Sequence, residues 1–78
     1  MSEVIRTHWT SHGTFKLVST IQAGQRACLL YLDEKYLGPY LSVQTAIAAI
    51  LHGDLNEDLG FDGKTSGVPE FYYKWNNL

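Results

Sequence analysis

Two motifs after Asp54 carry the residue types of ligand-binding loops. Asp62-Gly63-Lys64-Thr65 ends like a phosphate-binding loop, in which backbone amides and the lysine hold the phosphate oxygens. The first glycine of that motif falls at Asp58, and no parallel strand–loop–helix unit is predicted around it. Asp58 and Asp62 also fit the first and fifth positions of a calcium loop, but its closing carboxylate falls at Pro69 instead of Glu70. We therefore interpret the stretch as an acidic, solvated loop.

Histidine and cysteine are the other residues with possible metal or nucleophilic chemistry. His8 and His12 have the spacing of zinc ligands only on a helix, and here they fall on a predicted strand and turn. Cys28 lies inside an apolar strand, where a thiol behaves as a small packed side chain. His52 suits the negative end of a helix dipole. The sequence therefore predicts no catalytic residue, no metal site and no cofactor, and we do not expect an enzyme.

The chain has 78 residues, 45% of them hydrophobic, and a net charge of −2. This length predicts one small domain. Its core is expected in residues 3–53, followed by an acidic, glycine-rich loop in 54–67 and an aromatic segment in 68–78. The N-terminus does not read as a signal peptide, and no window approaches the ~20 apolar residues of a membrane span. We expect a cytoplasmic protein with no membrane contact.

Alternating apolar and polar residues predict four strands: Glu3–Thr10, Thr14–Ile21, Arg26–Leu32 and Lys35 to about Tyr40. The third strand is apolar on both faces, which is typical of a strand in the middle of a sheet with something packed on each side. Gly38-Pro39 weakens the last strand, because proline has no N–H. We expect that strand at an edge of the sheet.

A helix is predicted from Val43 to His52, with Ser42 as its N-cap and Gly53 just past its end. Its apolar residues repeat along a single helical stripe: Val43, Ile47, Ile50 and Leu51. The predicted fold is α+β, an antiparallel three- to four-stranded β-meander with one α-helix on one face and an aromatic C-terminal segment.

Tight turns at Ala23-Gly24 and Asp33-Glu34 would pair Val18 with Leu29, Lys16 with Tyr31, Tyr31 with Tyr36, and Leu29 with Gly38. A shift of one residue in register moves every side chain of a strand to the opposite face, so the assignment of residues to the two faces depends on this register. The first, helix-covered face is predicted to hold Trp9, Phe15, Leu17, Cys28, Leu30, Leu32 and Leu37. The second face is predicted to hold Arg6, His8, Lys16, Val18, Leu29, Tyr31, Tyr36 and Tyr40.

Three alternatives remain for what covers the second face: the chain's own C-terminal segment, a protein or a nucleic acid. The four rings of the C-terminal segment, Phe71, Tyr72, Tyr73 and Trp75, are expected to pack on the domain and would cover that face. A protein partner, either a second copy in a homodimer or another protein, fits the mixture of tyrosine, arginine and leucine. A nucleic acid would stack bases on the tyrosines and place its phosphates on Arg6, Lys16 and Lys35.

The leading hypothesis is a small binding module that acts through protein contacts, with nucleic-acid binding through the same face as the alternative. The net charge of −2 is mildly unfavourable for a nucleic-acid partner, and no small-molecule substrate is evident. Tyr31 and Tyr36 would be anchors, and Arg6 and Lys16 rim charges. The predicted partner-binding residues are Tyr31, Tyr36, Tyr40, Leu29, Val18, Arg6 and Lys16.

Leu37, Gly38, Tyr40, Ser42 and Ala46 lie where two strands lead into an alanine-rich helix. This pattern, from Gly13 to Leu51, resembles the three-stranded sheet plus helix of plant ethylene-response transcription factors and of phage integrase arm-binding domains. In those families the sheet enters the major groove of DNA. Their sheets direct several arginine and tryptophan side chains at the DNA, whereas this one carries few. The resemblance implies the same topology and a DNA-binding sheet.

Overall fold

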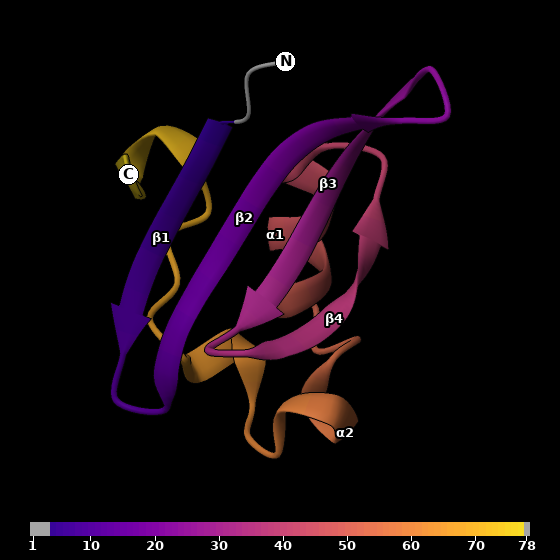
Figure 1. The fold of residues 1–78 in the computed structure, drawn as a ribbon. Helices are drawn as coiled ribbons and strands as arrows, with labels where there is room; N and C mark the ends of the chain where they lie inside the picture. Colours follow the sequence, from indigo (N-terminus) through magenta and orange to yellow (C-terminus); the bar gives the residue numbers. More distant parts are fainter. Residues whose placement is uncertain (1–3, 78) are drawn as a thin grey trace.

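A computed structural model describes residues 4–77 and, among these, the side chains of residues 5–76. The chain forms an antiparallel sheet in the order β4-β3-β2-β1-β5, with a helix behind it (Figure 1). The α+β fold predicted from the sequence is confirmed. Glu3 and Leu78, the outer bounds predicted for the first strand and the C-terminal segment, lie outside the described residues.

The first four strands form a meander: β1 (Val4–Thr10), β2 (Gly13–Gln22), β3 (Gln25–Leu32) and β4 (Lys35–Tyr40). Two residues join each strand to the next, the loop length that holds a hairpin most tightly. Strand β3 lies between β2 and β4, as its apolar sequence predicts. The strand is therefore hydrogen-bonded along both of its edges, and only one of its two faces contacts the helix.

The turn between β3 and β4 lacks a glycine and is held by a side chain instead. Asp33 has a φ of 54°. Its backbone N–H donates to the Thr14 carbonyl at 2.8 Å, and its carboxylate Oδ1 accepts from the Thr14 N–H at 3.0 Å. Aspartate tolerates this left-handed conformation better than most residues. These two bonds fasten the turn to the neighbouring hairpin.

Helix α1 (Val43–Leu51) covers one face of the sheet. The Ser42 hydroxyl accepts from the Thr45 N–H, and Gly53 follows the helix with a φ of 82°, so both predicted ends are confirmed. The core between the helix and the sheet consists of fully or nearly buried side chains, most of them aliphatic. They are Phe15, Leu17, Cys28, Leu30, Leu32, Ala46, Ile47, Ala49, Ile50, Leu55, Val68 and Trp75.

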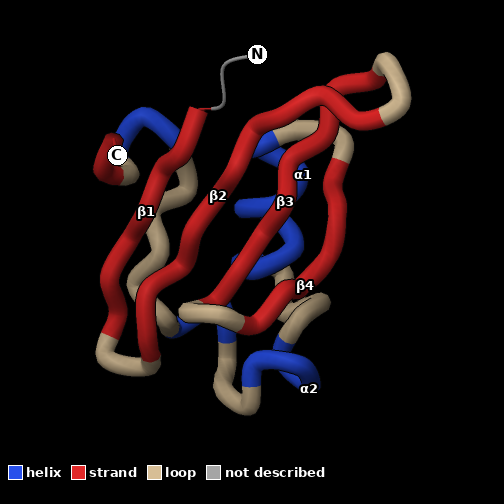
Figure 2. The backbone as a smooth tube through the Cα atoms, viewed as in Figure 1, coloured by secondary structure: helices blue, strands red, loops and turns tan. Residues whose placement is uncertain are grey.

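The residues after α1 contain more secondary structure than the predicted surface loop. They form α2 (Asn56–Leu59), two short 3-10 turns at Gly63–Thr65 and Tyr72–Lys74, and β5 (Asn76–Asn77). This segment runs along the helix side of the sheet and returns to β1, where β5 pairs with it (Figure 2). Leu55, on this stretch, belongs to the core.

Two register differences change the predicted faces. Thr10 pairs with Gly13, which places Arg6 and His8 on the helix side and Trp9 on the opposite side, the reverse of the prediction. A bulge in β4 then sets Pro39 instead of Gly38 opposite Leu29. The predicted pairs Val18–Leu29, Lys16–Tyr31 and Tyr31–Tyr36 are confirmed.

Candidate functional site

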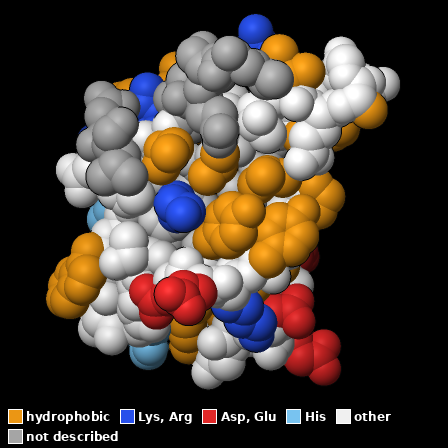
Figure 3. Space-filling view, viewed as in Figure 1, with side chains coloured by type: hydrophobic (Ala, Val, Ile, Leu, Met, Phe, Trp, Pro, Cys, Tyr) orange, Lys and Arg blue, Asp and Glu red, His pale blue; other side chains and the backbone are white. Residues whose placement is uncertain are grey.

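The sheet face opposite α1, which we call the outer face, is built in rows that cross the strands. One row is apolar on all four strands and contains Ile5, Val18, Leu29 and Pro39. The next row contains Thr7, Lys16, Tyr31 and Tyr36, and Trp9 lies beyond it on β1. Figure 3 views this face and shows hydrophobic side chains gathered over β2, β3 and β4. Within residues 4–77, no helix or strand packs on it.

The exposure of side chains on the outer face rises from its centre to its margins. Val18, at the centre between Ile5 and Leu29, is 7% exposed, whereas Tyr36 is 51% and Trp9 is 71% exposed. Exposed aromatic rings next to a continuous apolar row mark an interaction site more often than an ordinary surface. The centre of the face is therefore already packed, and its margins carry rings that a partner would cover.

One cation lies within the outer face. The Lys16 ammonium is 5.0 Å from the centroid of the Tyr31 ring, within the range of a cation–π contact. The Tyr31 and Tyr36 rings are themselves 5.4 Å apart at an interplanar angle of 50°. These contacts hold lysine and both rings in one row, and they direct the lysine charge toward an aromatic face.

Two of the predicted partner-binding residues lie on the other side of the sheet. The Arg6 guanidinium is 5.0 Å from the centroid of the Tyr72 ring, in the C-terminal segment. Tyr40 packs against the core, where burial raises the pKa of its hydroxyl, with smaller contributions from Asp54 and Asp58. Both assignments to the outer face were wrong, because one depended on the β1 register and the other on an unbroken β4.

The remaining predicted residues, Leu29, Val18, Lys16, Tyr31 and Tyr36, lie together on the outer face. The prediction missed Ile5, Trp9 and Pro39. A two-residue turn at Ser11-His12 would have indicated Ile5 and Trp9, because the length of this turn determines which β1 side chains share a face with Val18.

The C-terminal aromatic segment does not cover the outer face. Trp75 is 3% exposed and packs on the helix side, with its ring centroid 6.4 Å from that of Phe15 and 5.7 Å from that of His8. Its indole N–H donates to the Pro69 carbonyl at 3.2 Å. The other rings stay exposed, against the prediction that all four would pack: Phe71 at 45%, Tyr72 at 44% and Tyr73 at 63%.

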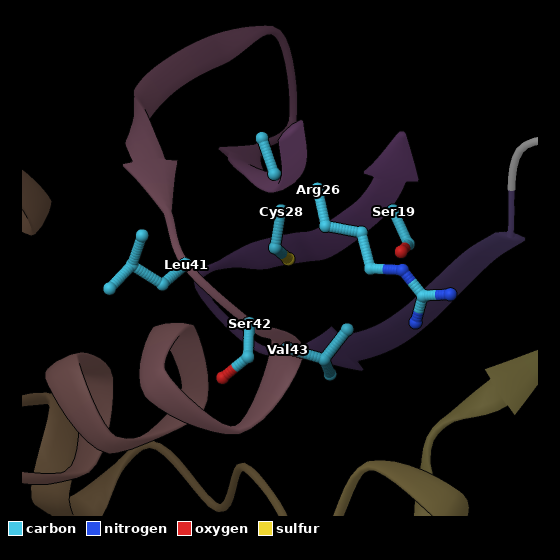
Figure 4. A pocket seen from close by; sticks show the side chains of 7 residues that line it. Ser19, Arg26, Cys28, Leu41, Ser42 and Val43 are labelled. Atoms are coloured by element: carbon cyan, nitrogen blue, oxygen red, sulfur yellow. The ribbon is translucent and has the colours of Figure 1, made fainter. Parts of the chain in front are cut away.

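A hollow of about 140 Å³ opens beside the start of α1 (Figure 4). Its lining residues are Ser19, Arg26, Ala27, Cys28, Leu41, Ser42 and Val43. Burial raises the pKa of the Cys28 thiol to about 11, so the sulfur is protonated at neutral pH and a poor nucleophile. None of the described residues that line this hollow is a histidine or a carboxylate that could act as a base for the thiol.

The residues considered as metal or phosphate ligands have structural contacts. His8 lies near Trp75, and the His12 ring stacks on Phe61 with centroids 4.1 Å apart. The Asp62 carboxylate accepts from the Lys64 N–H at 3.0 Å and from the Asn56 side-chain amide at 3.2 Å, which caps a 3-10 turn. Among the described residues, no three histidine, cysteine or acidic side chains gather as metal ligands would.

Comparison with protein-family models, with curated proteins and with solved structures returned no match for this chain. The resemblance of Gly13–Leu51 to ethylene-response factors and integrase arm-binding domains therefore stays a prediction. The described part of the chain has no helix with the length and apolar character needed to cross a bilayer.

Proposed function

We propose that this protein is a small cytoplasmic binding module whose outer face docks on the surface of another protein molecule. The observation that carries the proposal is the apolar row flanked by the exposed rings of Trp9 and Tyr36. Covering apolar surface is favourable by about 25 cal/mol per Å². Tryptophan and tyrosine are also the residues that most often dominate the energy of protein interfaces. A free, buried Cys28 thiol is consistent with a reducing compartment such as the cytoplasm.

The placement of the cations favours a protein partner over a nucleic acid. Of the three bases considered for phosphate contacts, only Lys16 lies on the outer face. Arg6 contacts Tyr72 on the helix side, and the Lys35 ammonium donates to the Asp58 carbonyl beside α2. Contacts to several phosphates supply most of the affinity for nucleic acids, so one lysine is a poor basis for such binding.

Site-specific photo-crosslinking in cells that naturally express the protein tests the proposal. A photoreactive phenylalanine analogue replaces Tyr36 on the outer face, and in a control variant it replaces Tyr73, which is exposed on the helix side. We expect adducts from position 36 that protease digests and nuclease leaves intact, and none of these adducts from position 73. Adding Leu29→Glu to the position 36 variant should abolish them, because a carboxylate then interrupts the apolar row.

Two results would count against the proposal. Adducts at position 36 that nuclease removes would show that the partner is a nucleic acid. The absence of any adduct, at position 36 and also with the analogue at exposed Trp9, would show that the outer face binds no macromolecule.

A further inference from the structure

We propose that the partner of the outer face is a second copy of this chain, which packs face to face in a symmetric dimer. This inference rests on the proposed function, since it names the occupant of the same surface. In such a dimer the two sheets lie about 10 Å apart with the helices outside. Each copy presents the same patch, as the two-fold symmetry of most homodimers requires.

The rows of the outer face are self-complementary about the line between β2 and β3. A two-fold axis along this line, parallel to the strands, places each β2 residue of one copy over the residue that is its β3 partner, in the other copy. Val18 of one copy then faces Leu29 of the other, so an aliphatic side chain meets an aliphatic one. By the same operation Lys16 faces the second copy's Tyr31, so a cation meets an aromatic ring.

The outer strands obey the same rule. The axis exchanges β1 with β4, which brings Ile5 of one copy over Pro39 of the other. Thr7 exchanges with Tyr36 and brings a small side chain over a large exposed ring. Among the described residues of the outer face, this axis places no two ammonium groups and no two carboxylates directly opposite each other. The Lys16 ammonium of each copy stays over its own Tyr31 ring, and this cation–π contact offsets the cost of covering the charge.

The size of the face sets the strength of the dimer. Four strands about 4.8 Å apart and about six residues long, at about 3.3 Å per residue, span about 400 Å² in projection. Two copies cover about 800 Å² of flat area, to which the contours of the side chains add, and this places the interface below the roughly 1,200 Å² of standard specific interfaces, among the weak ones. We therefore expect a reversible dimer with a dissociation constant in the micromolar range.

Sedimentation of the purified chain tests this directly. The protomer has a mass of 8.8 kDa. We expect twice that mass at high concentration and a return to 8.8 kDa on dilution. Leu29→Glu and Val18→Lys, each alone, should raise the dissociation constant at least about 100-fold, because each interface would bury unpaired charges. Tyr73→Glu, on the other side of the molecule, should leave the constant unchanged.

Mixing the two charged variants tests the axis. In a heterodimer the new lysine at position 18 faces the new glutamate at position 29 of the other chain, and the second central contact keeps its native pair. An equimolar mixture of the two should therefore dimerise where neither does alone. If both variants stay monomeric when mixed, this axis is wrong.

The remaining results separate the dimer from the wider proposal. A wild-type chain that stays monomeric at about 1 mM, about 100-fold above a dissociation constant of about 10 µM, overturns the dimer. Protein adducts from position 36 would then still support the proposed function. A Leu29→Glu chain that dimerises as well as wild type places the interface elsewhere. If circular dichroism shows that Leu29→Glu is unfolded, Tyr36→Glu provides the same test at a side chain that is already 51% exposed.

Discussion

Leu30 and Tyr31 are consecutive residues of β3 that point to opposite faces of the sheet, and replacing each by alanine tests which face the chain itself fills. Leu30 is completely buried in the core under α1. Tyr31 lies on the outer face and contacts Lys16 and Tyr36. Because the two positions are neighbours on one strand, the difference between the variants mainly reports the packing of the two faces.

The expected losses of unfolding free energy differ by about a factor of two. Leu30→Ala removes a fully buried side chain, which destabilises proteins by 2–5 kcal/mol, and we expect about 3–4 kcal/mol here. Tyr31→Ala removes a cation–π contact of about 0.5–1 kcal/mol and an aromatic pair of about 0.5–1.5 kcal/mol. The two contacts sum to about 1–2.5 kcal/mol, and the ring is only partly buried in the monomer.

Urea denaturation followed by circular dichroism measures both variants, at low micromolar concentration so that the protomer is the species observed. A chain of this length is expected to have about 4–12 kcal/mol of stability, so both transitions should be measurable. At high concentration, sedimentation should show that Tyr31→Ala has lost the dimer and Leu30→Ala has kept it. If Tyr31→Ala destabilises the dilute protomer as much as Leu30→Ala, the outer face is already covered by the chain itself and is not a docking surface.

Three further results are expected. Raising NaCl from 50 to 500 mM should change the dimer dissociation constant less than about threefold, because Lys16 is the one cation among the described residues of the outer face and none of them forms an ion pair there. A steep loss in sedimentation would indicate a charged interface. Gly63→Ala should destabilise the fold by about 1–3 kcal/mol or more in urea titrations, since its new Cβ would lie 2.1 Å from the Ile50 carbonyl oxygen; Lys64→Ala, at the exposed next position, is the control. Stability should also fall between pH 9 and about pH 11, because the Cys28 thiol has a pKa of 9.0 when unfolded and about 11 when folded, so the unfolded state binds fewer protons in this range. The loss is as much as about 3 kcal/mol at 1.36 kcal/mol per pKa unit, and Cys28→Ala should lack it; equal pH profiles for the two chains would contradict the assignment.

The sequence predicted the parts of the fold that depend on local chemistry. The apolar run in β3, the glycine turn at Ala23-Gly24 and the Ser42 cap each indicated the observed structure, because the deciding interactions lie within a few residues. The central pairs Val18–Leu29 and Lys16–Tyr31 followed from the length of one turn. This is why the middle of the outer face was predicted correctly.

The margins of the face were predicted wrongly because each depended on one residue of register. Trp9 was assigned to the helix-covered face, yet the pairing of Thr10 with Gly13 places it on the outer face. In β4, Gly38 has a φ of 128°, which side chains rarely adopt, and the resulting bulge turns Tyr40 toward the core. A glycine-proline pair in a strand is the signal that indicates such a break.

The course of the C-terminal segment could not be predicted, since nothing local links it to a face. Its position depends on long-range contacts, among them the burial of Trp75 against Phe15 and the pairing of β5 with β1. The three neighbouring aromatic rings, Phe71, Tyr72 and Tyr73, are 44% to 63% exposed, so aromatic content alone does not select the ring that enters the core.

The bulge in β4 also bears on how copies of this chain can assemble. An unbroken strand at a sheet margin offers a row of backbone groups onto which further chains can add, which is the route to fibrils. At this margin Pro39 has no N–H to offer and Gly38 interrupts the pleat, while the opposite margin ends in the two residues of β5. Addition of further strands along the hydrogen-bonding direction is thus hindered at both margins of the sheet.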